Sequence, residues 1–381
     1  MPSPVHALDV IVVGAGMAGA GIAAQLGPRL RVVVLEQEAQ PGYHATGRSA
    51  AVFAESYGGA TVRLLSRGSR GFLMQPPAGF AGEPLLLPRG FLFVARPDQR
   101  EALEALASQP DMRDGAIRMT PREACERMPL LRPDYVAEAL LDDAASDIDV
   151  HALHQGYLAM LRRDGGQLLC GARVTAIERL RGQWRVSTQS GCFEAPLLVN
   201  AAGAWADELA ALAGIAGIGL QPLRRTAALI DMPRINGMER WPLTIDIAEE
   251  FYFKPDAGRL LISPGDETPS APCDAVPDDL DLAIAVDRIE RATTLDVRRM
   301  HSRWSGLRSF VADRTPVAGF APDAPGFFWL AGQGGYGIQT APALSRFAAS
   351  QLLGLPMPSD LLDLGLDAMS LAAARLPRGA P

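Results

Sequence analysis

The chain opens with two short apolar segments on either side of a glycine-rich turn. Val10–Val13 is uniformly apolar and leads into Gly14–Gly19, and Met17–Leu26 has the small apolar composition of a buried helix. Val32–Glu36 is again apolar up to its last residue. Unbroken apolar strands of this length are typical of parallel sheets, in which both faces are covered. The pattern therefore predicts a buried β-α-β unit, and the glycines argue against a membrane span over Val10–Leu26.

Apolar strand patterns return in the middle and near the end of the chain. We expect strands at Arg173–Arg179, Trp184–Thr188, Leu197–Asn200, Leu223–Ile230, Glu250–Lys254, Leu260–Ser263 and Phe327–Leu330. We expect helices at Asp98–Leu106, Pro121–Met128, Asp147–Arg163 and Thr340–Leu353, the last of them ended by Gly354. Arg89–Ala95 resembles a hairpin, and residues 222–296 read as strands and loops.

Strand-then-helix signals occur at the start, middle and end of the chain, and the segments between them read as a different, largely antiparallel structure. This order predicts an α/β fold with a discontinuous nucleotide-binding domain, formed by residues 1–83, 145–220 and 300–370. A substrate-binding domain is then inserted in two pieces, residues 84–144 and 221–299.

The glycine-rich turn reads Gly-Ala-Gly-Met-Ala-Gly and has the spacing of a dinucleotide-binding motif. Gly14 permits the tight turn, Gly16 lets the backbone approach a pyrophosphate, and Gly19 lets the helix lie close to the sheet. Free N–H groups at the helix start then face the phosphates. Glu36, about 20 residues further on, is placed to bind ribose hydroxyls and to repel a 2′-phosphate, which disfavours NADP.

Three later segments favour FAD over NAD. The polar loop Gln40–Ala51 can follow a long cofactor toward its isoalloxazine ring. Asn200–Trp205 follows an apolar strand, and its small residues allow close approach of a ligand. Ala331–Thr340 is a second glycine-rich turn before a helix, whose N-terminus can stabilise negative charge on a reduced flavin.

Composition excludes some other classes of protein. The net charge of −7 argues against nucleic acid as a partner, because phosphates require an excess of Lys and Arg. Lys254 is the only lysine, which makes pyridoxal-phosphate chemistry improbable. The four cysteines and five histidines lie outside metal-binding spacings, and we expect isolated thiols and no metal site. The N-terminal residues carry no basic secretory signal.

The motifs together resemble the D-amino-acid oxidase and glycine oxidase superfamily of flavoproteins. The most similar branch is that of bacterial D-arginine dehydrogenases and related D-amino-acid dehydrogenases. The resemblance is carried by VVLEQEAQPGYHATGRSAA, DIDVHALHQGYL, LVNAAGAW, FYFKPDAG, WSGLRSFVAD and QGGYGIQT. It implies noncovalent FAD in a Rossmann-type domain, with an inserted α+β substrate domain built on a mostly antiparallel sheet.

The resemblance also assigns residues to the cofactor and to the substrate. The expected cofactor contacts are Gly14, Gly16, Met17, Gly19, Glu36, Gln37, His44, Thr46, Arg48, Ser49, Ala50, Ala51, Val174, Ala201, Gly203, Trp205, Gly334, Gly335, Tyr336, Gly337, Ile338 and Gln339. Arg308 and Tyr252 match the pair that binds the substrate carboxylate, and Arg225 matches a second cation. Tyr57 matches a tyrosine on a loop over the substrate, and Gly335 matches a glycine whose carbonyl accepts from the substrate amine. Arg225 could equally be a surface ion-pair partner, and Tyr252 a residue of the strand core.

Two departures from the D-arginine enzymes change the expected substrate. Phe91 stands where they have a glutamate for the substrate guanidinium, and Val52 stands where they have a histidine. A buried guanidinium without a partner costs several kcal/mol, about 3–5 kcal/mol in comparable cases. The sequence therefore predicts a preference for apolar or aromatic D-amino acids over D-Arg and D-Lys. The alternative is that Phe91 points elsewhere and Glu55 serves as the acid.

The expected reaction passes a hydride from the substrate Cα to flavin N5, and the imino acid then hydrolyses to a 2-oxo acid and ammonia. Related sarcosine oxidases hold their flavin through a cysteine and use a lysine near the flavin for the reaction with oxygen. This chain has no cysteine in the region after Arg308 and no lysine in the segment after Gly258. We therefore expect an acceptor other than oxygen, with a quinone as one candidate, and a cytoplasmic protein with at most peripheral contact with the inner membrane. An oxidase or dehydrogenase of N-substituted glycines is the alternative function.

Overall fold

The computed structural model describes residues 8–109, 112, 115–232, 235 and 237–377. Within these residues one sheet has the strand order β20-β21-β13-β1-β2-β9. Its members are β1 (Val10–Val13), β2 (Val32–Leu35), β9 (Gln167–Leu169), β13 (Leu197–Asn200), β20 (Val317–Phe320) and β21 (Phe327–Ala331). All neighbours pair in parallel except β20 and β21. Three separated parts of the chain thus build a single sheet.

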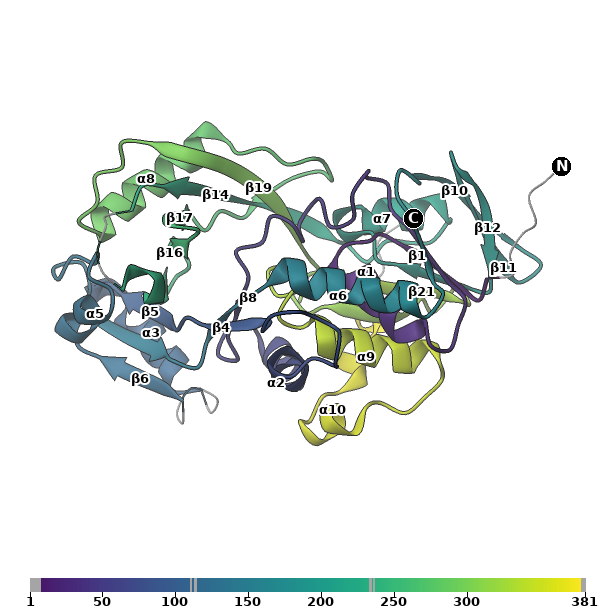
Figure 1. The fold of residues 1–381 in the computed structure, drawn as a ribbon, viewed down its shortest axis with the longest axis horizontal. Helices are drawn as coiled ribbons and strands as arrows, with labels where there is room; N and C mark the ends of the chain where they lie inside the picture. The colour runs from purple at the N-terminus through teal and green to yellow at the C-terminus, as the bar shows by residue number, and fades with distance from the viewer. Residues whose placement is uncertain (1–7, 110–111, 113–114, 233–234, 236, 378–381) are drawn as a thin grey trace.

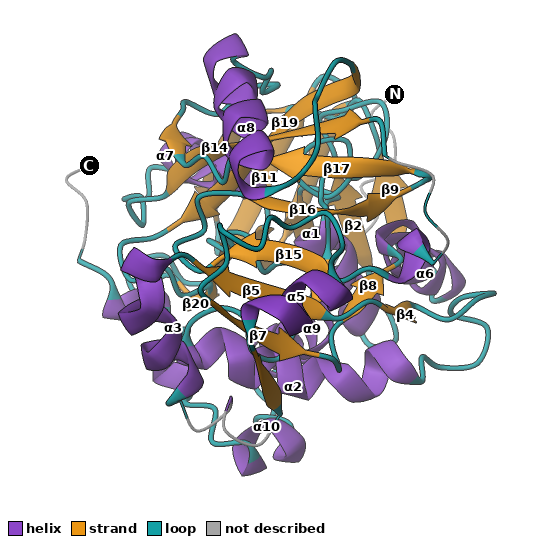
Figure 2. Cartoon of the chain, turned by 90° about the vertical axis from the view of Figure 1, so that its left-hand side faces the viewer, coloured by secondary structure: helices purple, strands orange, loops and turns teal. Residues whose placement is uncertain are grey.

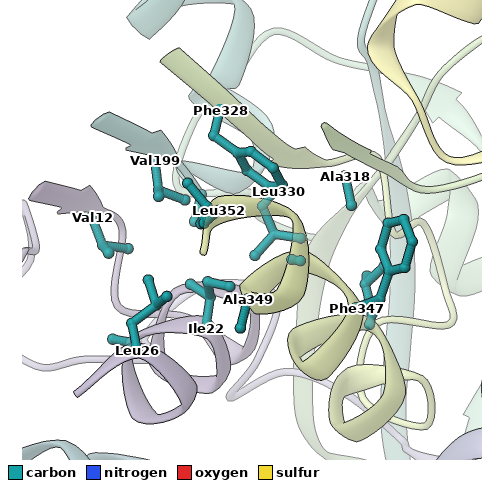
Figure 3. Packing of buried hydrophobic residues seen from close by; sticks show 14 of the residues in the cluster. Val12, Ile22, Leu26, Val199, Ala318, Phe328, Leu330, Phe347, Ala349 and Leu352 are labelled. Carbon is teal, nitrogen blue, oxygen red and sulfur yellow. The ribbon is translucent and has the colours of Figure 1, made fainter. Parts of the chain in front are cut away.

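Helices cover one face of this sheet because apolar side chains of both layers interlock. Figure 3 shows Val12, Val199 and Phe328 of the strands beside Ile22 and Leu26 of the first helix. The helices on this side are α1 (Met17–Leu26), α2 (Ala60–Met74), α6 (Val150–Arg163) and α9 (Ala341–Leu352). The other face is covered by a three-stranded sheet and by α7 (Ala206–Leu212). The strands of that smaller sheet are β10 (Val174–Leu180), β11 (Gln183–Thr188) and β12 (Gly191–Ala195).

A second large sheet has the order β18-β14-β17-β16-β15-β5-β7-β6, and β19 pairs with β14. Its strands are β5 (Phe91–Ala95), β6 (Ala116–Met119), β7 (Glu138–Asp142), β14 (Gln221–Ile230), β15 (Leu243–Asp246), β16 (Tyr252–Asp256), β17 (Arg259–Ser263), β18 (Thr268–Pro269) and β19 (Met300–Phe310). All neighbours are antiparallel except β15 and β5. Figure 1 shows β14 and β19 running from this sheet toward the first one.

Alternate residues of this sheet belong to two different cores. On one face Leu92 and Phe253 pack with α5 (Pro121–Arg127) and α8 (Asp279–Ala292), which Figure 2 shows in front of the strands. On the other face Phe91 and Tyr252 pack with α3 (Arg100–Ala107) and with residues 50–57. The second face is the one that looks toward the α/β sheet and forms one wall of the site. The fold is thus an α/β fold with a mostly antiparallel second sheet, as the sequence predicts.

The structure corrects three local predictions. Arg89–Ala95 is not part of a hairpin: β4 (Leu86–Pro88) pairs with β8 (Ser146–Ile148) in a small sheet with β3 (Val52–Phe53), whereas β5 pairs with β15 and β7. Gly90, with φ +79°, separates the two strands. The stretch 222–296 contains the helix α8, whose acidic start reads as a loop in the sequence. The sequence places residues 300–310 in the nucleotide-binding domain, but β19 forms its hydrogen bonds with β14 and is therefore part of the antiparallel sheet. The other domain boundaries stay predictions.

Candidate active site

A single long cleft runs from the carboxyl ends of the parallel strands to the second sheet. This is the edge at which α/β sheets bind nucleotides. Of the residues assigned from the sequence, the following line the cleft: Gly14, Gly16, Met17, Glu36, Gln37, His44, Thr46, Arg48, Ser49, Ala50, Val174, Ala201, Gly203, Trp205, Arg225, Tyr252, Arg308, Gly334, Gly335, Gly337 and Ile338. Seven others do not line it: Gly19, Ala51, Val52, Tyr57, Phe91, Tyr336 and Gln339.

The first glycine turn forms a cradle that side chains would fill. Gly14 has φ +101°, and a Cβ there would lie 2.3 Å from the carbonyl oxygen of Ala201. A Cβ on Gly19 would lie 1.8 Å from the oxygen of Gly14, so Gly19 acts in packing rather than in lining the cleft. Gly16 begins α1 without a side-chain cap, and its Cα faces Thr46 across the cleft. These close approaches fit a pyrophosphate at the start of α1.

Polar side chains hold this turn from both sides. Oε2 of Glu36 accepts a hydrogen bond of 2.7 Å from the N–H of Ala15, and Oε1 accepts one of 3.0 Å from the N–H of Glu38. From α6, Nε2 of His154 donates to the carbonyl of Ala15 at 2.9 Å. Burial lowers the pKa of His154, which keeps the ring neutral. His154, whose role the sequence did not reveal, therefore stabilises the turn directly.

The polar loop after β2 is fixed by its own contacts. Oγ1 of Thr46 accepts from the N–H of Met17 at 2.9 Å, at the start of α1. The guanidinium of Arg48 donates to the carbonyl oxygens of Ala275 (2.9 Å) and Ser305 (2.8 Å) and pairs with Asp274. Arg48 therefore ties the loop to the second sheet while its side chain lines the cleft. His44 bonds Glu38 at 2.9 Å, and its ring centre lies 4.6 Å from that of Trp205.

Arg308 lies at the far end of the cleft, where the two sheets meet. Its guanidinium lies over the backbone of Gly335, where a Cβ would come within 2.8 Å of Nη1. Within the described residues Arg308 has no hydrogen bond or ion pair. Burial lowers its pKa, but Tyr252, Tyr57 and Glu249 raise it more, so the guanidinium stays charged. A charged guanidinium without a partner that faces a cleft is suited to a carboxylate.

Arg225 differs from Arg308 because it already has partners. Its Nε donates to the carbonyl of Asp266 at 2.8 Å, and Nη2 pairs with Glu267 at 3.4 Å. Its guanidinium carbon lies 6.0 Å from the ring centre of Tyr252. Glu267 also pairs with Arg314 through two contacts of 2.7 and 3.1 Å. Arg225 thus lines the cleft while belonging to an ion-pair chain, and its role as a second substrate cation stays a prediction.

Residues 50–58, which we call the covering segment because the family resemblance predicts that Tyr57 covers the substrate, pack beside Phe91 and Tyr252. The hydroxyl of Tyr57 donates to Oε2 of Glu249 at 3.0 Å. The Tyr57 ring is 5.5 Å from that of Phe91 and 5.2 Å from that of Tyr336. Burial, and then the charge of Glu249, raises the pKa of Tyr57, so its hydroxyl remains a donor. Val52 packs in the same apolar core as Phe91 and Tyr252.

The covering segment has further anchors. The N–H of Ala54 donates to Oε1 of Gln339 at 3.1 Å, and Oγ of Ser56 donates to Oδ2 of Asp142 at 2.6 Å. Asp142 is directly opposite Phe91 in the pairing of β5 with β7. Glu55, the alternative partner for a substrate cation, pairs with Arg70 of α2 at 3.5 Å and lines a separate cleft.

Several residues near the site were missed in the sequence. Glu249 and Asp142 lie outside the quoted motifs, His154 lies within one but was given no role at the site, and the partners of all three lie far away along the chain. Gln333 and Cys273 line the cleft without having been assigned to it. No cluster of three or more His, Cys, Asp or Glu side chains suited to a metal occurs among the described residues. None of the helices in that part of the chain is both long and apolar enough to span a membrane.

A family model described as FAD dependent oxidoreductase (DAO) matches residues 9–351. The chain belongs to this family. FAD is accordingly its cofactor, and the bare glycine cradle at α1 agrees with a long dinucleotide. The residues that line the cleft from Gly14 onward would hold this cofactor, and their assignment to it stays a prediction.

The curated relatives of this chain are named for different activities. The chain is 26% identical to hydrogen cyanide synthase subunit HcnC of Pseudomonas aeruginosa, over 87% of this chain and 89% of that protein. It is 24% identical to mitochondrial dimethylglycine dehydrogenase of Mus musculus over 64% of this chain. That match covers 30% of the mouse enzyme, so the chain spans less than a third of that relative.

Solved structures of this fold agree over nearly the whole chain. L-proline dehydrogenase from P. horikoshii superposes with a TM-score of 0.81 at 21% identity, covering 93% of this chain and 96% of that one. Glycine oxidase from Geobacillus kaustophilus superposes with a TM-score of 0.80 at 23% identity, covering 95% and 99%. These likenesses establish the fold, an FAD-binding sheet with a mostly antiparallel second sheet.

Proposed function

We propose that this DAO-family protein is a dehydrogenase of D-amino acids and that it prefers apolar or aromatic side chains. The observation that carries the proposal is the charged, unpartnered guanidinium of Arg308 at the inner end of the cofactor cleft. A planar guanidinium binds a carboxylate through two parallel hydrogen bonds. The resemblance to bacterial D-arginine dehydrogenases supports the D configuration.

The charges at this end of the site support an anionic group on the substrate. The cations are Arg225, Arg308 and Arg314, and the nearby acidic residues are Glu249, Glu267 and Asp266. Arg225 and Arg314 both pair with Glu267, whereas Arg308 has no ion-pair partner among the described residues, so it is the cation that a substrate carboxylate can neutralise. Buried charges are tolerated when they are paired, so a monoanionic substrate is favoured over a cationic one.

The residues of the site can fix the substrate without supplying a base. When bound, FAD supplies the acceptor for two electrons and the α-hydrogen of the substrate. Arg308 and the hydroxyl of Tyr252 hold the carboxylate, and the carbonyl of Gly335 accepts from the amine. The rings of Tyr57 and Phe91, whose centres lie 5.5 Å apart in the core next to Tyr252, would limit the access of water to the reacting carbon. With the amine bound in its neutral form, loss of the hydride leaves an iminium and no proton leaves nitrogen in that step, and water then hydrolyses the iminium to a 2-oxo acid and ammonium.

The wall beside the site favours an apolar substrate side chain. Phe91 and Phe93 lie in contact on β5, with ring centres 4.7 Å apart, and Val52 packs in the same core. Asp142, the acid opposite Phe91, already accepts hydrogen bonds from Ser56 and from the N–H of Ala144. A substrate guanidinium there would compete with these bonds, whereas a leucine or phenylalanine side chain would not.

We further propose that FAD is held noncovalently and that an acceptor other than oxygen takes the electrons, a quinone being one candidate. Cys273 is the thiol that lines the cleft among the described residues, so it is the one to check for a covalent bond to FAD. Acid precipitation that leaves all yellow colour in the supernatant supports noncovalent binding.

The proposal is tested with a panel of D- and L-amino acids and an artificial electron acceptor, measuring acceptor reduction together with the 2-oxo acid and ammonia. We expect turnover with D-Leu, D-Met and D-Phe, and little with their L forms or with D-Arg. Turnover of none of the D-amino acids would overturn the proposal.

A second candidate is oxidation of N-substituted glycines, because dimethylglycine dehydrogenase is among the relatives and such substrates carry the same carboxylate. N-methylglycine and N,N-dimethylglycine belong in the same panel. Turnover of these alone, with formaldehyde as product, would favour the second candidate.

A further inference from the structure

The turn between β15 and β16 presents two consecutive glutamates to different surroundings. Glu249 faces the active site, where it accepts the hydrogen bond from Tyr57. Glu250 faces away and accepts two hydrogen bonds from Arg96, of 2.9 Å to Oε2 and 3.3 Å to Oε1. The turn therefore connects the cover of the site to a charged cluster behind it.

The backbone conformation of Glu249 explains why the two side chains diverge. Glu249 has φ +57°, a left-handed conformation that a residue with a Cβ seldom adopts. Its N–H donates to the carbonyl of Asp246 at 2.8 Å, and the N–H of Asp246 donates to the carbonyl of Phe251 at 3.0 Å. A Cβ on Gly265 would lie 1.9 Å from the oxygen of Glu249, so this glycine leaves the space that the turn occupies. Such a conformation persists only where the surroundings enforce it.

The surroundings of the turn are ionic and largely buried. Asp246, which is fully buried, accepts from the N–H of Ala248 at 2.9 Å and from Nε2 of Gln99 at 3.0 Å. Nη1 of Arg96 lies 3.5 Å from Oδ2 of Asp246, so one guanidinium contacts carboxylates at both ends of the turn. Arg288 of α8 donates to the carbonyl of Glu250 and, at 2.5 Å, to that of Pro264.

We propose that Arg96 is a positioning residue for the active site. By binding Asp246 and Glu250 together it holds the turn in the conformation that brings the Glu249 carboxylate to Tyr57. It thereby favours the closed form of the covering segment. Arg96 directly follows β5, the strand that carries Phe91, so the same strand forms the side-chain wall and anchors the cover. The inference rests on the proposed function only in the kinetic part of its test.

The first measurement needs no substrate. Hydrogen–deuterium exchange of the FAD-loaded protein is compared for wild type, Arg96→Gln, Tyr57→Phe and the double variant. The exchange rate in peptides covering residues 50–58 should rise at least threefold in Arg96→Gln. It should rise equally in Tyr57→Phe and in the double variant, because both lack the same hydrogen bond. Asp98→Asn is the matched control, because Asp98 is an exposed partner of Arg96 that does not contact the turn. It should leave the exchange unchanged.

The second measurement uses whichever substrate reduces the wild-type flavin. Arg96→Gln should lower kcat/KM about fivefold, and combining it with Tyr57→Phe should cause no further loss, since both act through one hydrogen bond. Effects that multiply, or an unchanged exchange of residues 50–58, would overturn the proposal even where the melting temperature falls. If Arg96→Gln does not fold, Glu250→Gln or Arg96→Lys replaces it, and each is again compared alone and in combination with Tyr57→Phe. If no compound reduces the flavin, the proposed function is contradicted, and the hydrogen–deuterium exchange result alone decides whether Arg96 positions the covering segment.

Discussion

The hydroxyl of Tyr57 donates a 3.0 Å hydrogen bond to Glu249, which lies 192 residues further along the chain. Tyr57 belongs to the covering segment, and Glu249 belongs to the turn after β15 in the antiparallel sheet. Arg308 lies close enough to both to alter their electrostatics. This hydrogen bond therefore joins the covering segment to the sheet that carries Arg308 and Tyr252, the residues proposed to bind the substrate carboxylate.

Tyr57→Phe removes this hydrogen bond and keeps the ring that packs on Phe91. A hydrogen bond to a charged group contributes about 1.5–3 kcal/mol, so we expect kcat/KM for the best D-amino acid to fall about 10-fold or more. Steady-state kinetics on FAD-loaded protein measure this. Unchanged kcat/KM would show that the bond has no part in turnover.

Arg308→Met should raise KM about 100-fold or more, because a substrate carboxylate loses its bidentate partner at a cost of about 2–5 kcal/mol. Arg308→Lys keeps the charge without the planar fork and should lie between Arg308→Met and wild type. Arg118→Gln is the matched control, since Arg118 pairs with Glu104 and Glu138 on the surface. All three variants should bind FAD stoichiometrically. A wild-type KM in Arg308→Met would remove the basis of the carboxylate assignment.

Phe91→Glu should move specificity toward cationic substrates. We expect the ratio of kcat/KM for D-Arg over D-Leu to rise more than about 10-fold, since a buried ion pair replaces an unpaired cation. Phe91→Leu, which keeps an apolar wall, should leave the ratio near its wild-type value. If wild type already prefers D-Arg, the apolar wall is not what selects the substrate, and Asp142 opposite Phe91 becomes the acid to test.

The pKa of His154 predicts how stability depends on pH. Burial lowers this pKa in the folded state, whereas the ordinary value is about 6.5. A lowered pKa means that the unfolded state takes up the proton first, so the free energy of unfolding decreases as the pH falls below about 6.5. His154→Gln should flatten this decrease, and His151→Gln, at an exposed position of the same helix, should change it much less, because burial lowers the pKa of His154 more than His151 does. Melting temperatures between pH 5 and 8 decide between these outcomes.

The parts of the fold that the sequence predicted are those in which local chemistry dictates local structure. Gly14 and Gly19 are required because a Cβ at either position would collide with backbone atoms of the turn, so this part of the motif is visible in the sequence. Val10–Val13, Met17–Leu26 and Leu197–Asn200 form the expected elements with the expected bounds because each is almost entirely apolar. The family resemblance added the positions of Arg308 and Tyr252, which no local pattern reveals.

The remaining features depend on distant pairing. Glu249 and Glu250 are chemically identical neighbours, and only the left-handed turn sends one toward Tyr57 and the other toward Arg96. Arg225 was consistent with two roles, and only the position of Glu267 shows that it is already paired.

The central claim is that a D-amino acid bound through Arg308 reduces the FAD. The most direct measurement is the absorbance of the bound flavin near 450 nm, roughly where oxidised flavins absorb, after anaerobic mixing with D-Leu, L-Leu and D-Arg. The account predicts rapid and complete bleaching by D-Leu, little or none by L-Leu, slow bleaching by D-Arg, and a much slower reaction of D-Leu with Arg308→Met. Bleaching by L-Leu in preference to D-Leu, or by neither D-Leu nor any other D-amino acid, would contradict it.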